Sequence, residues 1–271
     1  MKHLIATTLF VLACPAFAQE ASPAPTGAGA GADTTAADAA PAAPAAPAAA
    51  SVTYNLGLIS DYRYRGISQT RLRPALQGGA DWTDPASGWY LGTWLSSITW
   101  AKDAGGGGHV EIDVYGGKRG TLDNGISYDV GVLGYVYPGN GLGDVPGYVN
   151  GNTGEVYGQL GYGPYYVKYS NALTNLFGFV DSRYSSYLDL GANLDAGNGV
   201  TVILHAGRQH VQHSLNASYT DWKIGVAKAW GPTTVTLAAV GSNAAEAAYT
   251  SAANGKFLGR KALVLGVVRT F

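Results

Sequence analysis

The chain has 271 residues with 17 basic and 18 acidic side chains, and its formal net charge of −1 excludes a strongly basic surface for nucleic acid. Charged residues make up only 13% of the chain, about half the usual fraction in soluble globular proteins. The 39 glycines disfavour a helical protein, because glycine destabilises helix interiors. This composition favours many strands joined by turns.

The first 18 residues are predicted to be a cleaved secretory signal peptide. Lys2 gives a positive start, Leu4–Ala13 an apolar core, and Ala16–Ala18 a small-x-small cleavage site. A lipoprotein signal ending at Cys14 is the alternative, although its apolar core would be very short. Cys14 is the only cysteine, so the cleaved chain would contain no disulfide.

Residues 19–50 are rich in Ala and Pro and carry no large apolar side chain, which predicts a disordered, extended tether. A cell-wall-binding arm is the alternative. The pattern changes at Ser51, where apolar side chains begin to alternate with small or polar ones, as in a strand. Residues 51–271 are therefore predicted to form one β-domain.

Similar alternating segments recur to the last residue, and about twelve strands are expected. Most approach the ~9–11 residues that cross a bilayer at a tilt. The predicted strands are Val52–Leu58, Leu76–Trp82, Gly88–Ile98, His109–Lys118, Gly125–Tyr137, Gly154–Tyr162, Tyr165–Ser170, Tyr184–Asp195, Gly199–Arg208, Tyr219–Trp230, Thr233–Ser242 and Ala262–Phe271.

The connections between these strands alternate between short and long. Short turns include Asp123–Gly125 and Gly163–Pro164, whereas Pro138–Thr153 and Asn243–Lys261 are long. This alternation is typical of outer-membrane barrels with short periplasmic turns and long extracellular loops. An even strand number places both termini on the periplasmic side. A soluble β-sandwich or lipocalin-like barrel is the alternative.

The alternation also predicts which side chains face the lumen. In the fourth strand Val110, Ile112 and Val114 should face lipid, which turns Glu111 and Asp113 inward. The candidate lumen-lining residues are Glu111, Asp113, Asp129, Glu155, Gln159, Lys168, Asp189, Asn193, His205, Asp221 and Lys223.

The last strand is apolar and ends on an aromatic residue, Phe271. Lipid cannot satisfy free backbone groups, so this strand should pair with Val52–Leu58 and close the barrel. Phe271 and the alternating apolar residues before it are also predicted to be the signal recognised by the barrel assembly machinery. Arg269 departs from that pattern, and its charge should lie near the membrane rim.

Four arginines fall within eleven residues of the first long loop: Arg63, Arg65, Arg71 and Arg73. Guanidinium groups suit carboxylates and phosphates. These arginines could attract anionic solutes, contact the phosphates of lipopolysaccharide, or fix the loop by pairing with Asp61 and Asp81.

The same segment carries a resemblance. Asp61-Tyr-Arg-Tyr-Arg-Gly-Ile-Ser-Gln69, followed by Pro74-Ala-Leu-Gln-Gly-Gly79, resembles the opening strands of the TorF-type porin family of proteobacteria. The resemblance covers about Ser51 to Phe271 and implies an outer-membrane β-barrel with a porin role. It supplies neither a substrate nor functional residues.

His210, His213 and Ser214 lie in a long loop, where a lipid hydrolase would need Ser, His and an orienting acid or amide. The two histidines could also hold a metal, but plain exposed loop histidines are the preferred interpretation. We predict an all-β, antiparallel up-and-down transmembrane barrel in the outer membrane of a Gram-negative bacterium, without cofactor. Its expected function is passive diffusion of small hydrophilic solutes, with a lipid-active enzyme and a structural envelope barrel as alternatives.

Overall fold

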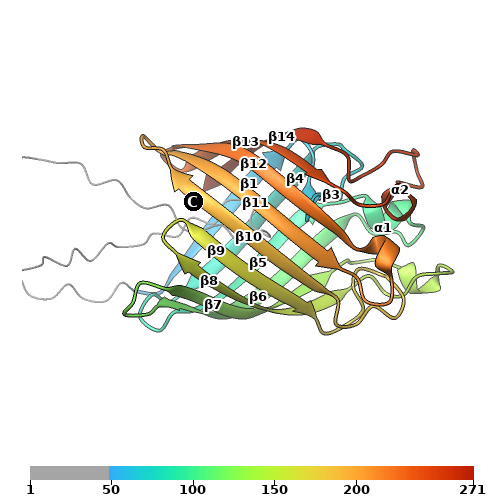
Figure 1. The fold of residues 1–271 in the computed structure, drawn as a ribbon, viewed down its shortest axis with the longest axis horizontal. Helices are drawn as coiled ribbons and strands as arrows, with labels where there is room; N and C mark the ends of the chain where they lie inside the picture. The colour runs from blue at the N-terminus through green and yellow to red at the C-terminus, as the bar shows by residue number, and fades with distance from the viewer. Residues whose placement is uncertain (1–48) are drawn as a thin grey trace, which may run out of the picture.

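Twelve antiparallel strands close into one barrel in the computed structural model, which describes residues 49–271 (Figure 1). Each strand pairs with its neighbours in an up-and-down order, which confirms the predicted all-β barrel. The barrel strands are β1 (Ser51–Ile59), β4 (Ala75–Thr83), β5 (Trp89–Ser97), β6 (Val110–Thr121), β7 (Ser127–Val136), β8 (Thr153–Tyr162), β9 (Tyr165–Ala172), β10 (Ser186–Asp195), β11 (Val200–His210), β12 (Tyr219–Trp230), β13 (Thr233–Ser242) and β14 (Ala262–Thr270). The predicted signal peptide and nearly all of the tether lie outside the described residues.

The two ends of the barrel differ. One end carries the long connections with α1 (Trp100–Asp103) and α2 (Glu246–Tyr249), and the other carries the short turns and the C-terminus (Figure 1). Short 3-10 turns cover Leu142–Asp144 and Leu215–Ala217 at the long-loop end. No helix in residues 49–271 is long and apolar enough to cross a membrane.

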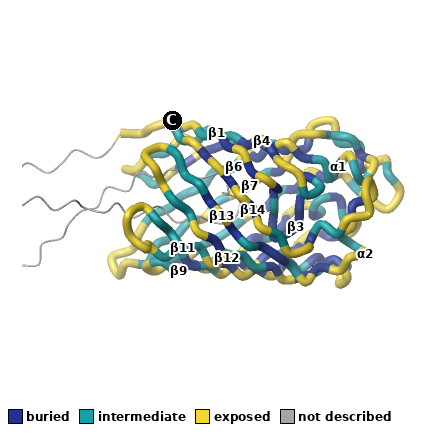
Figure 2. Tube along the Cα trace, turned by 90° about the horizontal axis from the view of Figure 1, so that it is seen from above, coloured by how far each residue is buried: buried dark blue, intermediate teal, exposed yellow. Residues whose placement is uncertain are grey.

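Buried and exposed residues alternate along the strands (Figure 2). In β14, Leu263 is 73% exposed and Leu265 49%, whereas Val264 between them is 1% exposed. The same alternation runs around the barrel and leaves a continuous apolar outer surface. An exposed apolar surface of this extent requires an apolar environment.

Tyrosine rings lie flat against glycines on the inner face, which explains why both residue types are abundant. A Cβ atom added at Gly191 would lie 2.3 Å from the ring of Tyr166, its partner on β9. A Cβ at Gly117 would lie 2.6 Å from the hydroxyl of Tyr90. These glycines make room for the rings, so the interior is filled from neighbouring strands.

The interior is not uniformly polar. Charged side chains point inward from β6 to β12, but β13 and β14 present small apolar residues such as Ala238 and Val264. A hydrophobic cluster joins this apolar wall to Trp94 and to Tyr64 of the first long connection. The sequence predicted a polar lumen and did not predict this apolar wall.

The first long connection differs from the open loop that the sequence predicted. It forms a two-stranded hairpin of β2 (Arg63–Tyr64) and β3 (Ile67–Ser68). The hairpin is buried, because its side chains bond to residues on the inner faces of β7 and β8. Buried residues accordingly gather toward the end that carries β3, α1 and α2 (Figure 2).

The seam that closes the barrel joins β1 to β14, as the sequence predicted. Their register runs from Asn55 opposite Thr270 to Ile59 opposite Gly266. Beyond it the amide of Phe271 donates to the Tyr54 carbonyl at 2.8 Å, and the Tyr54 amide donates to the Phe271 carbonyl at 3.2 Å. The last residue therefore extends the seam.

Deletion of Phe271 should lower the yield of folded barrel, because it removes these two hydrogen bonds and an exposed apolar ring from the seam. Heat-resistant electrophoretic mobility after insertion in cells and after refolding into vesicles would measure the yield. A defect in cells alone would point to recognition by assembly machinery, and a defect in both to the seam itself. Wild-type yield in both assays contradicts the prediction.

Candidate functional site: the hairpin inside the barrel

The turn of the hairpin has a backbone that only certain residues tolerate. Arg65 has φ of 46° and Gly66 φ of 77°, the two positive values of a tight two-residue hairpin turn. A Cβ atom at Gly66 would also lie 2.6 Å from Cβ of Asp221 on β12. Two separate features therefore require glycine at position 66: the positive φ of the turn, and the close approach of the turn to the barrel wall.

Arg65 at this turn bridges the interior. Its guanidinium donates to both carboxylate oxygens of Glu155 at 3.1 and 2.8 Å, and to Oε1 of Gln209 at 2.8 Å. It also lies between two aromatic rings, 4.7 Å from the centroid of Tyr64 and 4.4 Å from that of Tyr187. A bidentate pair between planar groups fixes orientation as well as distance, so the turn is held in one position.

Tyrosine hydroxyls attach the rest of the hairpin to the wall. The Tyr62 hydroxyl donates to Oε1 of Glu111 at 2.7 Å, and Tyr64 shares a 2.6 Å hydrogen bond with Tyr135. Burial, and then the nearby carboxylates of Glu111 and Asp113, raise the pKa of Tyr62 well above its usual range. Tyr62 therefore keeps its proton and remains a donor.

The other arginines of this segment have different surroundings. Nε of Arg63 donates to Asp61 at 2.6 Å, and its guanidinium also bonds to backbone carbonyls, including that of Leu258 at 2.9 Å. Arg71 forms a bidentate pair with Asp103. Arg73 is exposed. Three of the four arginines are therefore neutralised by acids of this chain. None of these three pairs with Asp81, the other partner considered from the sequence.

Two acidic groups stand out on the inner face of β6. Glu111 accepts the hydrogen bond from Tyr62, but both carboxylate oxygens of Asp113 are buried with no hydrogen-bond partner among the described residues. Asp113 is fully buried. An unpaired buried carboxylate is costly, which suggests a role other than packing.

Farther around the wall, His205 lies between two carboxylates. Its Nδ1 is 2.7 Å from Asp189 and its Nε2 is 2.8 Å from Asp221. The Tyr187 hydroxyl donates to Asp221 at 2.9 Å, and the Tyr187 ring lies against Arg65. Tyr187 therefore connects the histidine–carboxylate cluster to the turn of the hairpin.

All the candidate lumen-lining residues lie on the interior parity of their strands and are buried or half-buried. The structure brings Glu111, Asp113, Glu155 and Asp221 close to the hairpin. Lys168 lies 4.2 Å from the ring centroid of Tyr157, beyond the hairpin contacts. Whether any of these residues contacts a solute stays a prediction.

Sequence reasoning missed Tyr64, Tyr135, Tyr187 and Gln209, the groups that hold the hairpin. Alternation placed Tyr135 and Tyr187 on the inner face, whereas Gln209 lay just beyond the predicted strand Gly199–Arg208, and nothing local indicated which partner they would meet. Gly66 was the available signal, because a glycine between two short β-prone segments permits the positive φ of a tight hairpin turn. The sequence left open whether the arginines attract solutes, contact lipid phosphates or pair within the loop.

The loop histidines are not brought together. His210 bonds to Gln212 at 3.1 Å, and His213 lies 3.1 Å from the exposed Asp181. Neither of these contacts involves a serine. Within residues 49–271, no cluster of three His, Cys, Asp or Glu side chains is arranged to hold a metal ion.

Several solved structures are similar to this chain. The NanC porin is 10% identical over 81% of this chain and 99% of its own, with a TM-score of 0.49. OccAB2 of Acinetobacter baumannii is 7% identical over 73% of this chain and 55% of its own, with a TM-score of 0.38. A mutant of the Rh. blastica porin is 14% identical over 72% of this chain and 55% of its own, with a TM-score of 0.35. No curated protein sequence matches the chain.

These comparisons do not confirm the specific resemblance to TorF-type porins. The family model that matches, over residues 41–271, describes bacterial proteins of unknown function. This match includes the whole barrel and the hairpin inside it. The chain therefore belongs to the Gcw_chp family of bacterial proteins.

Proposed function

We propose that this protein is an outer-membrane channel for the passive diffusion of small hydrophilic solutes. One observation carries the proposal: the same closed wall is apolar outside and charged inside from β6 to β12. An apolar outer band matches lipid, and charged groups inside a barrel interact with water and hydrophilic solutes. The resemblance of the hairpin segment to TorF-type porins is consistent with this role and remains a prediction.

The orientation follows from the two ends. Six exposed aromatic side chains surround the short-turn end, as expected at a membrane interface. They are Trp82, Trp89, Tyr162, Tyr165, Trp230 and Phe271. We place this end in the periplasm and the long connections outside the cell. Of the four arginines of the first long connection, the exposed Arg73 is then the one available to lipopolysaccharide phosphates.

The hairpin acts as the constriction of this channel. It enters from the long-loop end, and the ion pair between Arg65 and Glu155 links it to the wall. Removing one partner of a buried pair costs about 3–5 kcal/mol, largely through the orphaned charge. The hairpin is therefore a fixed obstruction as long as this pair persists.

The charge balance inside favours cations over the anionic solutes suggested by the arginine-rich loop. Arg63 and Arg71 are each paired with an acid, which leaves the inward-facing side chains of the strands and Arg65. Asp113 is left out of the balance, because no partner among the described residues stabilises its charge. The other inward acids still outnumber the bases: they are Asp81, Glu111, Asp129, Glu155, Asp189 and Asp221, against Arg65, Arg119, Lys168 and Lys223. His205 adds a positive charge only when protonated.

Wild-type protein in planar bilayers should show small single-channel steps, and the double variant Arg65→Ala/Glu155→Gln should show larger ones. The double change removes both charges and the Arg65 side chain that bridges the interior, so it widens the passage without leaving an orphaned carboxylate and without altering the net interior charge. Arg73→Ala is the matched control and should conduct like wild type. No channel events from folded wild-type protein would defeat the channel proposal, and an unchanged conductance in the folded double variant would defeat the constriction.

The wild-type channel should prefer K⁺ to Cl⁻, and Arg119→Gln should strengthen that preference, because the Arg119 guanidinium is always charged and is half-buried on the inner face of β6. One charge about 8 Å from a permeating ion contributes about 0.5 kcal/mol in water, with opposite sign for cation and anion. The permeability ratio should therefore rise on the order of five-fold, measured from the reversal potential in a salt gradient. Glu246→Gln removes an exposed acid on α2, where salt screens it, and should change little. Anion preference in the wild type would contradict the charge argument.

A further inference from the structure

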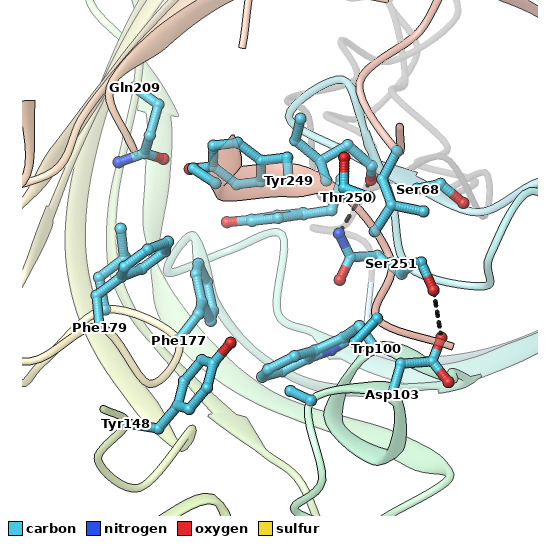
Figure 3. A pocket seen from close by; sticks show the side chains of 18 of the residues that line it. Ser68, Trp100, Asp103, Tyr148, Phe177, Phe179, Gln209, Tyr249, Thr250 and Ser251 are labelled. Atoms are coloured by element: carbon cyan, nitrogen blue, oxygen red, sulfur yellow. Dashed lines mark hydrogen bonds between the residues drawn. The ribbon is translucent and has the colours of Figure 1, made fainter. Parts of the chain in front are cut away.

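A cavity of about 170 Å³ lies at the long-loop end, outside the hairpin (Figure 3). Five of the six long connections contribute to its lining, together with Gln209 of β11 and Tyr219 of β12, which makes it the vestibule of the proposed channel. Eight of the lining residues are aromatic: Tyr64, Trp100, Tyr137, Tyr148, Phe177, Phe179, Tyr219 and Tyr249. A solute that enters from this side meets these rings first.

The rings that line the vestibule meet edge to face. Trp100 and Tyr137 cross at 86° with centroids 4.9 Å apart, and Tyr219 and Tyr249 cross at 79° at 5.1 Å. Tyr64 and Phe177 cross at 83° at 5.5 Å. Edge-to-face and offset arrangements are also the favourable ones for a further aromatic ring. An aromatic ligand in the cavity can therefore form the same kind of contact with these side chains.

The polar groups around the cavity are mostly engaged with other residues of the chain. Ser68 donates to Asp61 at 2.5 Å, and Gln209 accepts from Arg65. Asp103 pairs with Arg71 and accepts from Ser251 at 3.3 Å (Figure 3). A sugar that entered this cavity would lose the hydrogen bonds between its hydroxyl groups and water. Few groups of the lining could replace them, so its binding is unfavourable.

One donor is an exception. The indole N–H of Trp100 is buried and has no hydrogen-bond partner among the described residues. Buried donors are nearly always paired, with protein or with another group. Trp100 lines the vestibule, but its N–H is closed off from the cavity in this structure, so a ligand oxygen accepts this bond only after the indole ring turns.

We infer that the vestibule binds a neutral compound with one six-membered aromatic ring and one hydrogen-bond-accepting oxygen, of which phenol is the simplest. An apolar cavity of about 150 Å³ accepts benzene, so the measured volume holds one such ring. The inference goes beyond the hydrophilic solutes of the proposed function, on which it rests only for the position of the vestibule at the outer entrance.

The test measures equilibrium binding to the full chain in detergent by titration calorimetry. Phenol and toluene should bind saturably, whereas glucose and cyclohexanol should bind far more weakly. Trp100→Phe keeps a ring and removes the N–H, so phenol should lose about five-fold in affinity, the effect of one neutral hydrogen bond, and toluene should not. Tyr249→Leu should weaken both, and Tyr162→Leu, at the other end, neither.

Each result decides the matter. Glucose binding as tight as phenol, or no saturable phenol binding by folded wild type, overturns the inference. Equal losses for phenol and toluene in Trp100→Phe overturn the role of the indole donor. Phenol binding without any conductance would leave this site in place and defeat the channel, and conductance without phenol binding would do the reverse.

Discussion

Backbone closure is the constraint on which the rest of this structure depends. Every strand is paired on both sides, and the seam between β1 and β14 completes the circle. Lipid offers no hydrogen bonds, so a barrel with one open edge would expose unpaired amides and carbonyls at a high cost. Closure fixes the parity of every strand, and parity decides which side chains face outward and which meet inside.

Closure also creates an interior that must be filled. Glycines and tyrosines on neighbouring strands fill part of it, as Gly191 and Tyr166 illustrate. The hairpin of β2 and β3 fills the long-loop half, with its tyrosines on the apolar side and Arg65 on the acidic side. The hairpin therefore presents apolar contacts to one part of the interior wall and a charge to another.

Residues at different positions along the barrel axis therefore have different proposed roles. The aromatic vestibule at the long-loop end accepts one type of group, and the Arg65 turn controls the space behind it. The charged side chains of the inner wall, among them Arg119 of β6, set the electrostatic potential of the remaining interior. Binding, obstruction and ion preference can then be changed separately, because they depend on different residues.

By itself the sequence determined the twelve strands, their facing and the closing pair, because strand alternation and turn residues act locally. It placed Glu155 and Asp221 inside for the same reason. It named Asp61 as a possible partner in the loop, where Arg63 finds it, but it did not determine that Arg65 and Arg71 are paired, since Glu155 and Asp103 are distant from them in the chain. Only the tertiary structure decided this, because the hairpin enters the barrel through contacts that exist once the wall has closed.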